Sequence, residues 1–201
     1  MNLEKLDLLA KSDPILEKII SEIPAPEVVS THNVFHDLMS CVIEQQIHYR
    51  STKGIFRKLL DKARLSELNL ENFAHFEEHA LQDVKLSMNK QETISDILEF
   101  WSRNQVDWER LDEIEVKKEL SSIKGIGKWT IDMILLYTLR GPDIFPVDDY
   151  HLKQIMVSLY GLDPQVGLKS RMIEISTTWQ NHKSLAVLYL PAWKAHHRNR
   201  G

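Results

Sequence analysis

Apolar residues recur at helical spacing along most of the chain, and no segment shows the strict alternation that marks a β-strand. The first apolar face follows Asp13-Pro14, a dipeptide typical of a helix N-cap with proline in the first turn. A clearly amphipathic helix begins at Val34, and another near residues 50–63 directs its basic residues outward. The pattern therefore predicts an all-α protein.

The segment from Lys128 to about Leu139 differs from these helices because it is apolar on nearly every side. We expect such a helix to be buried as a central strut. A helix rich in Glu and Lys precedes it, near residues 111–120. Further helices are expected near residues 150–160, 166–178 and 184–190.

The proline-rich break Pro24-Ala25-Pro26 ends the first predicted helix and marks a boundary between two parts of the chain. We therefore expect a central helical lobe over residues 31–140 and a second lobe formed by residues 1–30 plus 141–201. A chain of 201 residues, 43% of them hydrophobic, can bury one good core or two small lobes.

Composition excludes several classes of protein. No apolar run approaches the length of a membrane span, and the N-terminal residues are too charged for a signal peptide. We expect an intracellular protein. The single cysteine, Cys41, excludes an internal disulfide and a four-cysteine iron–sulfur site. No His, Cys, Asp and Glu set has metal-ligand spacing, and we expect no required cofactor.

The distribution of charge bears on nucleic acid binding. The formal net charge of −4 argues mildly against it, because DNA-binding domains are usually basic. Basic residues nevertheless cluster at 50–64 and 194–200, whereas acidic residues concentrate at 67–119. Either the molecule is polarised and presents a basic face, or these runs are ordinary solvated surface.

A glycine hairpin, Ile123-Lys124-Gly125-Ile126-Gly127, separates the polar helix from the strut. Glycines accept positive φ and let another backbone come close. The amides that follow lie at a helix N-terminus, where unpaired N–H groups and the dipole favour an anion. Lys124 and Lys128 add positive charge. These features predict a phosphate contact that is blind to base sequence. The alternative is a plain turn with glycine as a C-cap.

After the strut, a tight turn at Arg140-Gly141-Pro142-Asp143 leads through Phe145-Pro146 to the paired carboxylates Asp148 and Asp149. The whole stretch from Leu120 to Ile155 resembles the helix-hairpin-helix (HhH-GPD) base-excision DNA glycosylases. Within them it looks like the 3-methyladenine DNA glycosylase II type. The resemblance extends, more weakly, from Val34 to Leu190.

This resemblance implies a two-lobed helical fold with the active-site cleft between the lobes. It implies a DNA glycosylase of base excision repair that flips and releases alkylated purines, such as 3-methyladenine or 7-methylguanine, from double-stranded DNA. We expect the enzyme to act as a monomer, without a membrane or a nucleotide cofactor. The alternatives are a related glycosylase for a deaminated or oxidised base, and a non-catalytic DNA-binding protein that kept only the hairpin.

The family's catalytic aspartate is the second of the pair, which corresponds to Asp149, and Asp148 is then the better N-cap candidate. A helix N-terminus favours a charged carboxylate. Such a carboxylate can stabilise the oxocarbenium character that develops on the sugar, and it can orient a water. An alkylated purine is already cationic and needs less help from an acid. Helix capping alone is the alternative role for Asp149.

The remaining site residues also follow from the resemblance. The lysine that forms a Schiff base in strand-nicking relatives is replaced by Trp129, so no lyase activity is expected. The pocket for the extruded base would be lined by Trp129, Met133, Tyr150 and Leu190, for each of which core packing is the alternative. Residues 179–184 resemble a degraded Trp-x-Pro-aromatic-Arg-Ser motif of the family.

The expected DNA contacts come from two turns. Gln46 matches the family's minor-groove wedge, with Ile47 and His48 beside it, although an ordinary polar turn is the alternative. The backbone carbonyls of Ile123 and Ile126 are candidates to hold a structural Na⁺ or K⁺. The hairpin residues expected to hold the phosphate backbone are Lys124, Gly125, Ile126, Gly127, Lys128 and Thr130.

Overall fold

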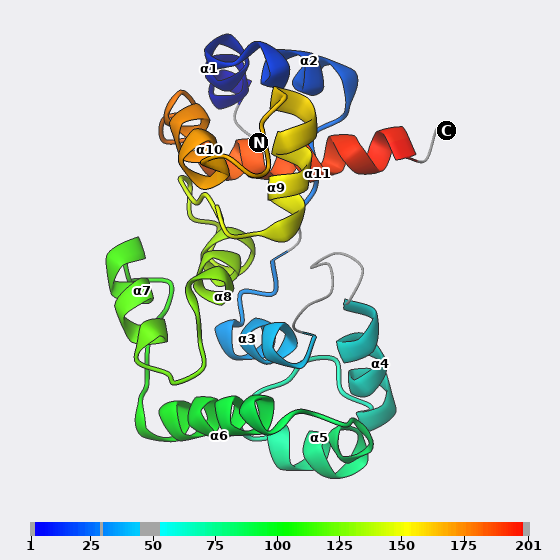
Figure 1. The fold of residues 1–201 in the computed structure, drawn as a ribbon. Coiled ribbons are helices and arrows are strands. Elements are labelled where there is room, and N and C mark those ends of the chain that lie inside the picture. The colour runs from blue at the N-terminus through cyan, green and yellow to red at the C-terminus, as the bar shows by residue number, and fades with distance from the viewer. Residues whose placement is uncertain (1–2, 29, 45–52, 199–201) are drawn as a thin grey trace. The chain divides into compact units, whose positions relative to one another are not determined.

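A computed structural model describes residues 3–28, 30–44 and 53–198. Every regular element within these ranges is a helix, as the coiled ribbons of Figure 1 show, and the described residues contain no strand. The all-α prediction is confirmed. No helix among the described residues is long and apolar enough to cross a membrane.

The chain divides into two compact units at residues 29/30 and 139/140. The expected lobes, residues 31–140 and residues 1–30 plus 141–201, have their boundaries one residue later. Unit 1 takes in both ends of the chain and residues from 140 onward, and unit 2 spans Ser30–Leu139. The helices of unit 2 are α3 (Val34–Ile43), α4 (Lys53–Ala63), α5 (Phe73–His79), η1 (Leu81–Asp83), α6 (Met88–Arg103), α7 (Glu113–Ser121), α8 (Lys128–Met133) and η2 (Ile134–Thr138).

The core of unit 2 forms around α3, whose Leu38 and Met39 are completely buried. α3 packs against α6 and η2. The predicted strut consists of α8 followed directly by η2, a π-helical turn in which the Leu139 amide donates to the Ile134 carbonyl over 2.9 Å. Its burial is as expected from the sequence, but the widened turn is not.

A buried carboxylate fastens the end of the strut within unit 2. The Asp37 Oδ2 atom accepts hydrogen bonds from the hydroxyl groups of Thr31 and Thr138, each over 2.7 Å. Because a buried carboxylate is costly unless its oxygens are hydrogen-bonded, this pairing stabilises the junction of α3 with η2.

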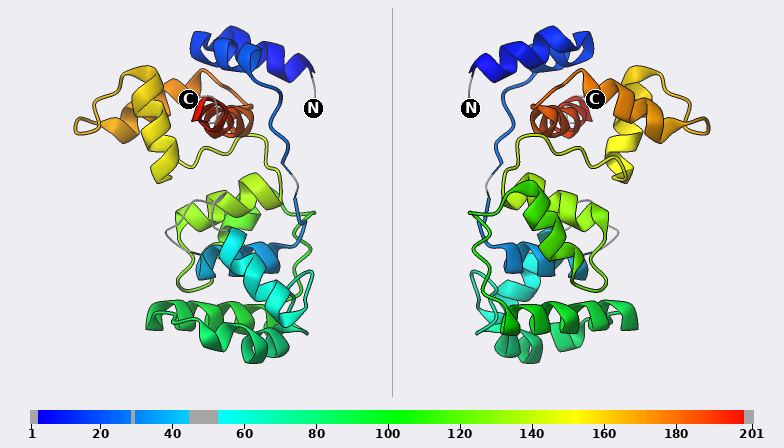
Figure 2. Two further views of the ribbon diagram at one scale, coloured as in Figure 1. Left: turned by 90° about the vertical axis from the view of Figure 1, so that its right-hand side faces the viewer. Right: turned by 90° about the vertical axis from the view of Figure 1, so that its left-hand side faces the viewer.

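Unit 1 contains α1 (Leu3–Ser12), α2 (Pro14–Glu22), α9 (Tyr150–Tyr160), α10 (Leu168–Thr177) and α11 (Lys183–Arg198). Figure 2 shows α11 nearly end-on within this unit, where it packs against α2 and α9. α11 continues through Pro191 and is therefore longer than the helix expected near residues 184–190.

Asp13 caps α2 as predicted and also organises the core of unit 1. Its Oδ1 atom accepts from the amides of the first turn of α2. Its Oδ2 atom accepts from the Tyr160 hydroxyl and from Trp179 Nε1, each over 2.8 Å. Burial, with a further contribution from the bond to Asp13, raises the pKa of Tyr160 well above its ordinary value. The network joins α2, α9 and the segment before α11.

Candidate functional site

The hairpin between α7 and α8 is anchored by its isoleucines and presents the residues between them to solvent. Ile123 and Ile126 are buried, whereas Lys124, Gly125 and Gly127 are exposed. The Ile126 amide donates to the Ile123 carbonyl over 3.2 Å, which closes the turn. The fold of unit 2 therefore exposes the backbone at Gly125 and Gly127, as a phosphate contact requires.

The fold of unit 2 itself requires a glycine at position 125. Its φ of +86° lies in the left-handed region, and a Cβ at this position would lie 2.1 Å from Thr93 Oγ1 on α6. Real Cβ atoms do not approach other atoms so closely, and residues other than glycine are strained at this φ. The hairpin backbone thus rests directly on α6.

Gly127 has no such internal reason to be glycine. Its φ is −94°, which other residues adopt freely, and no atom lies within 4 Å of the Cβ that a side chain would add. Gly127 is the N-cap of α8, and it supplies no side chain to cap the first turn. A molecule that approaches from outside and binds the amides of that turn would account for the missing side chain.

The charged and hydroxyl side chains beside the hairpin differ from the sequence-based expectation. Lys128 is exposed, but its Nζ atom lies 2.5 Å from a carboxylate oxygen of Asp132, whose side chain is almost fully buried. Lys128 therefore compensates a buried charge in addition to any role at the surface. Thr130 is only 2% exposed, so a phosphate would have to contact its backbone amide rather than its hydroxyl group.

The two aspartates have opposite roles from those expected for capping. Asp149, not Asp148, is the N-cap of α9, and its Oδ1 atom accepts from the Leu152 amide over 2.7 Å. Asp148 instead pairs with Lys169 Nζ at 3.0 Å, and Lys153 Nζ lies 3.8 Å away. The charge of Asp148 is compensated by lysines, whereas that of Asp149 faces the positive end of an α-helix of 11 residues.

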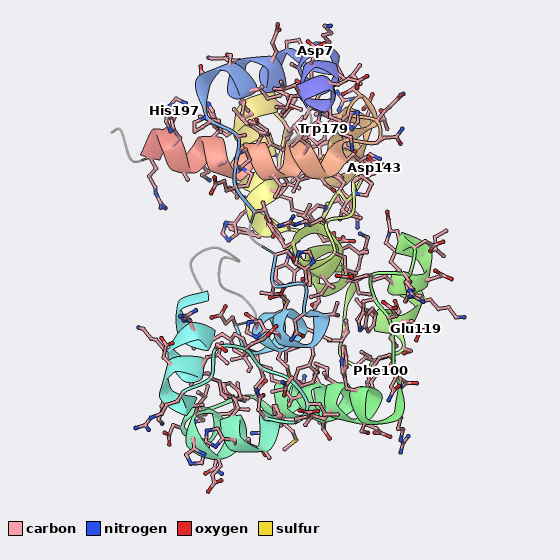
Figure 3. All side chains as sticks on the ribbon, turned by 180° about the vertical axis from the view of Figure 1, so that it is seen from behind. Asp7, Phe100, Glu119, Asp143, Trp179 and His197 are labelled. Atoms are coloured by element: carbon pink, nitrogen blue, oxygen red, sulfur yellow. The ribbon has the colours of Figure 1, made fainter. Side chains whose placement is uncertain are left out.

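The loop that leads to Asp149 is held by the start of α11. Ser184 Oγ donates to the Gly141 carbonyl over 2.5 Å and accepts from the Ile144 amide over 2.8 Å. Lys183 Nζ forms an ion pair of 2.5 Å with Asp143. Figure 3 labels Asp143 and Trp179 near this end of α11.

This arrangement gives a physical meaning to the motif at 179–184. Its tryptophan is anchored on Asp13 in the core, and its last two residues hold the loop that precedes Asp149. The sequence pattern indicates the motif but not these contacts, because the loop lies about 40 positions earlier in the chain.

The four predicted pocket residues belong to different units. In unit 2, Trp129 is half-buried and Met133 is 3% exposed. In unit 1, Tyr150 is 65% exposed, and its ring contacts His151 edge-on at 5.2 Å, while Leu190 is completely buried. The two aromatic residues present ring surface to solvent. Met133 and Leu190 do not, and they can only support a pocket surface from behind.

The predicted wedge residues Gln46, Ile47 and His48 lie outside the described residues. The helices on either side of them are tied down. Lys90 Nζ donates to the Ile43 carbonyl at the end of α3 over 3.0 Å, and burial lowers the pKa of this lysine. Glu44, which is buried, accepts from the Phe56 amide in the first turns of α4 over 2.6 Å.

The candidate cation site at the hairpin can be considered from its carbonyls. The Ile123 carbonyl accepts the Ile126 amide, and a carbonyl oxygen has a second lone pair with which it can bind a cation. No group of three or more His, Cys, Asp or Glu residues in the described part of the chain is arranged to bind a metal.

Comparison with known proteins places this geometry in context. The model of the HhH-GPD superfamily of base excision DNA repair proteins matches residues 39–181. A DNA-3-methyladenine glycosylase of Bacillus subtilis is 28% identical over 195 residues, which cover 90% of this chain and 64% of that protein. The chain thus spans slightly less than two thirds of the length of this relative.

Two solved structures are similar over nearly the whole chain. The first is the Schizosaccharomyces pombe 3-methyladenine DNA glycosylase in complex with abasic DNA, with a TM-score of 0.75 and 22% identity over 95% of both chains. The second is a DNA-3-methyladenine glycosidase of Bacillus halodurans, with a TM-score of 0.73 and 26% identity over 95% of this chain and 88% of that one. The likeness establishes the fold.

Proposed function

Because the chain belongs to the HhH-GPD superfamily of base excision DNA repair proteins, we propose that it is a DNA glycosylase that releases alkylated purines of the 3-methyladenine and 7-methylguanine type. The observation that carries this proposal is Asp149, a carboxylate at the N-cap of α9 within the matched region. By the resemblance of the sequence, Asp149 corresponds to the family's catalytic aspartate. The named relatives, which are 3-methyladenine glycosylases, support the choice of lesion.

Asp149 would act on the sugar rather than on the base. As the glycosidic bond breaks, positive charge develops on the sugar, and a carboxylate held near it stabilises that charge electrostatically. The bond from the Leu152 amide fixes the position of Oδ1, and the helix dipole favours the charged carboxylate. The same carboxylate would orient the attacking water. Since an alkylated purine leaves as a neutral base, no strong general acid is needed.

The hairpin would hold the DNA backbone close to the lesion. The open space at Gly127 lets a phosphate reach the amides of the first turn of α8. Lys124 supplies an exposed positive charge. A Na⁺ or K⁺ ion on the carbonyls of Ile123 and Ile126 would add a positive charge at the same place.

The flipped base would stack on an aromatic ring, either the half-buried Trp129 or the exposed Tyr150, because electron-rich rings bind cationic bases well. Gln46 would fill the gap left in the duplex. By the resemblance of the sequence, Trp129 replaces the lysine of strand-nicking relatives, so the product would be an intact strand with an abasic site. Incubation with lesion-bearing DNA and borohydride should trap no covalent complex, and efficient trapping would contradict this assignment.

The decisive experiment measures release of free base from methylated duplex DNA by the wild type, Asp149→Asn and Asp148→Asn. Asparagine caps helices about as well as aspartate, so Asp149→Asn keeps the bond to Leu152 and the fold while it removes the charge. We expect Asp149→Asn to lose base release by about two to three orders of magnitude, a magnitude typical for loss of one electrostatic stabiliser.

The matched control removes the neighbouring charge. Asp148→Asn breaks the pair with Lys169 at the surface and should retain most of the activity. Equal release by the wild type and Asp149→Asn would remove Asp149 from the mechanism. Binding of DNA without release of any methylated base by the wild type would favour a binding protein, or a glycosylase for another lesion.

A further inference from the structure

A groove opens in unit 2 where α6 ends and the chain leads into α7. It has a volume of about 540 Å³ and is lined by aromatic residues, Phe100, Trp101 and Trp108, and by polar residues that include Asn104 and Asp107. The two indole rings stack with centroids 5.6 Å apart and planes 24° apart. Figure 3 labels Phe100 at this end of α6. None of these residues has a part in the proposed DNA chemistry.

The groove is separate from the hairpin although both use α6. The hairpin contacts α6 at Thr93, seven residues before Phe100. At about 1.5 Å per residue along a helix, the two places are about 10 Å apart along the axis. A ligand bound in the groove therefore need not contact Gly125 or Gly127 of the hairpin.

The segment of the chain that carries the groove is acidic. Residues 67–119 contain 14 acidic and six basic residues, a net charge of −8, so the rest of the chain has a net charge of +4. At the groove itself, Arg103 and Arg110 pair with Glu99 and Asp107. Glu109 is 73% exposed, with a nitrogen of His32 at 3.6 Å. A polyanion such as DNA would be repelled here, and a cation would be attracted.

Two further features favour a positively charged ligand. α6 has 16 residues and ends at Arg103, so the negative end of its dipole points toward the groove. The ring faces of tryptophan attract Lys and Arg side chains, and arginine stacks on them most often. Net charge, helix dipole and aromatic rings are independent of one another, and all three select the same kind of ligand.

We propose that this Trp101–Trp108 groove binds a basic peptide segment of a partner protein. An arginine side chain lies on the indole surface, and a neighbouring basic residue of the peptide lies beside the exposed Glu109. The proposal does not depend on the glycosylase activity, because it uses none of the residues assigned to DNA.

The test uses a fluorescein-labelled peptide of alternating glycine and arginine, titrated with the full chain and followed by fluorescence anisotropy. Its partner peptide has each arginine replaced by citrulline, which has nearly the same shape without the charge. We expect saturable one-to-one binding of the arginine peptide, and binding of the citrulline peptide weaker by at least about tenfold, as expected from the loss of charge and cation–π attraction. Equal binding of the two peptides would overturn the proposal.

Variants locate the binding site. Trp108→Ala should weaken binding of the arginine peptide by about tenfold, with urea unfolding as the check that the variant folds. Glu109→Gln keeps the fold and should weaken it about threefold. The matched control is Glu78→Gln, which removes the same charge from the same acidic region at a side chain that is also 73% exposed and also near a histidine. If Glu78→Gln weakens binding as much as Glu109→Gln, the attraction is diffuse and the groove is not the site.

Two further measurements distinguish the proposed peptide from other possible occupants of the groove and from peptide binding at the hairpin. Gly127→Ala, at the hairpin, should leave peptide binding unchanged, and an equal loss there would place the peptide at the DNA contact. Light scattering reports whether the groove is covered by a second copy of the chain. A dimer that Trp108→Ala dissociates would overturn the proposal in favour of self-association.

Discussion

Gly125→Ala is the substitution for which the structure gives the most definite magnitude. The new Cβ would lie 2.1 Å from Thr93 Oγ1 and 3.0 Å from Thr93 Cβ and Cγ2. Alanine at a φ of +86° costs about 1–2 kcal/mol, and forcing an extra carbon into a filled space costs about 1–3 kcal/mol. We therefore expect the free energy of unfolding to fall by about 2–5 kcal/mol, a large part of the stability of a typical domain.

A double-mutant cycle separates these two costs. Thr93→Ala removes Oγ1, the closest atom, together with Cγ2, but it leaves Cβ at 3.0 Å and the backbone of Gly125 in its left-handed conformation. In the Thr93→Ala background, Gly125→Ala should therefore cost about 1–3 kcal/mol less than it does alone, and the remaining cost is the conformational strain plus the tight contact with the Cβ of residue 93. Gly127→Ala, with an open Cβ position, should change the free energy of unfolding by less than about 1 kcal/mol.

Urea unfolding followed by circular dichroism measures all of these variants at one protein concentration. A Gly125→Ala protein within about 0.5 kcal/mol of the wild type would refute the reasoning, because neither the clash nor the strain would then exist. If the changes in the free energy of unfolding caused by Gly125→Ala and Thr93→Ala were strictly additive, the side chain of Thr93 would not be the source of the clash. DNA affinity measured on the same samples should fall for Gly127→Ala although its stability is unchanged, which tests the approach of a phosphate.

Three other substitutions follow from the same structure. Tyr160→Phe removes one donor from the buried carboxylate of Asp13 and should lower the free energy of unfolding by about 1–3 kcal/mol in urea. Burial raises the pKa of Tyr160 in the folded protein above its ordinary value of 10.0. The stability that this group contributes is therefore complete below pH 10 and is lost as the pH rises further. The wild type should accordingly lose its advantage in stability over Tyr160→Phe in alkali. Glu44→Ala leaves a buried amide of α4 without its acceptor and should lower the free energy of unfolding by about 1–3 kcal/mol. Glu44→Gln keeps an acceptor and should restore most of this loss. Equal losses for the two variants would show that the charge, not the acceptor, matters. Ser184→Ala removes two bonds to the loop that leads to the predicted catalytic carboxylate and should lower base release, whereas Ser176→Ala, whose buried hydroxyl bonds only to its own helix, should not.

Local signals predicted most of the helices. Asp13-Pro14 begins α2, and α9 spans the expected residues 150–160, because capping residues and helical periodicity act within a few positions of one another. The helix expected near residues 184–190 was too short, because α11 does not end before Pro191. The helix continues through it, and Trp193 Nε1 donates to Glu22 over 2.8 Å, a contact with α2 that no local pattern reveals.

The roles of Asp148 and Asp149 show where local reasoning fails at the site. Either residue is a good N-cap by type, so the sequence alone does not choose between them. The choice depends on the turn before them, in which the Asp149 amide donates to the Pro146 carbonyl over 2.9 Å. It also depends on Lys169, which attracts Asp148 from 21 positions away. Both effects come from the folded loop.

The two glycines of the hairpin look alike in the sequence, yet the structure gives different reasons for the absence of a side chain at each position. Gly125 is fixed by Thr93, 32 positions earlier, and would be needed in a protein that never met DNA. A Cβ at Gly127 would meet nothing within the protein, so the fold leaves room there for a group from outside the chain. A glycine that the fold does not require, at the first turn of a helix and beside an exposed lysine, is stronger support for an external anion than the Gly-x-Gly pattern itself, because the pattern is equally satisfied by two structural glycines.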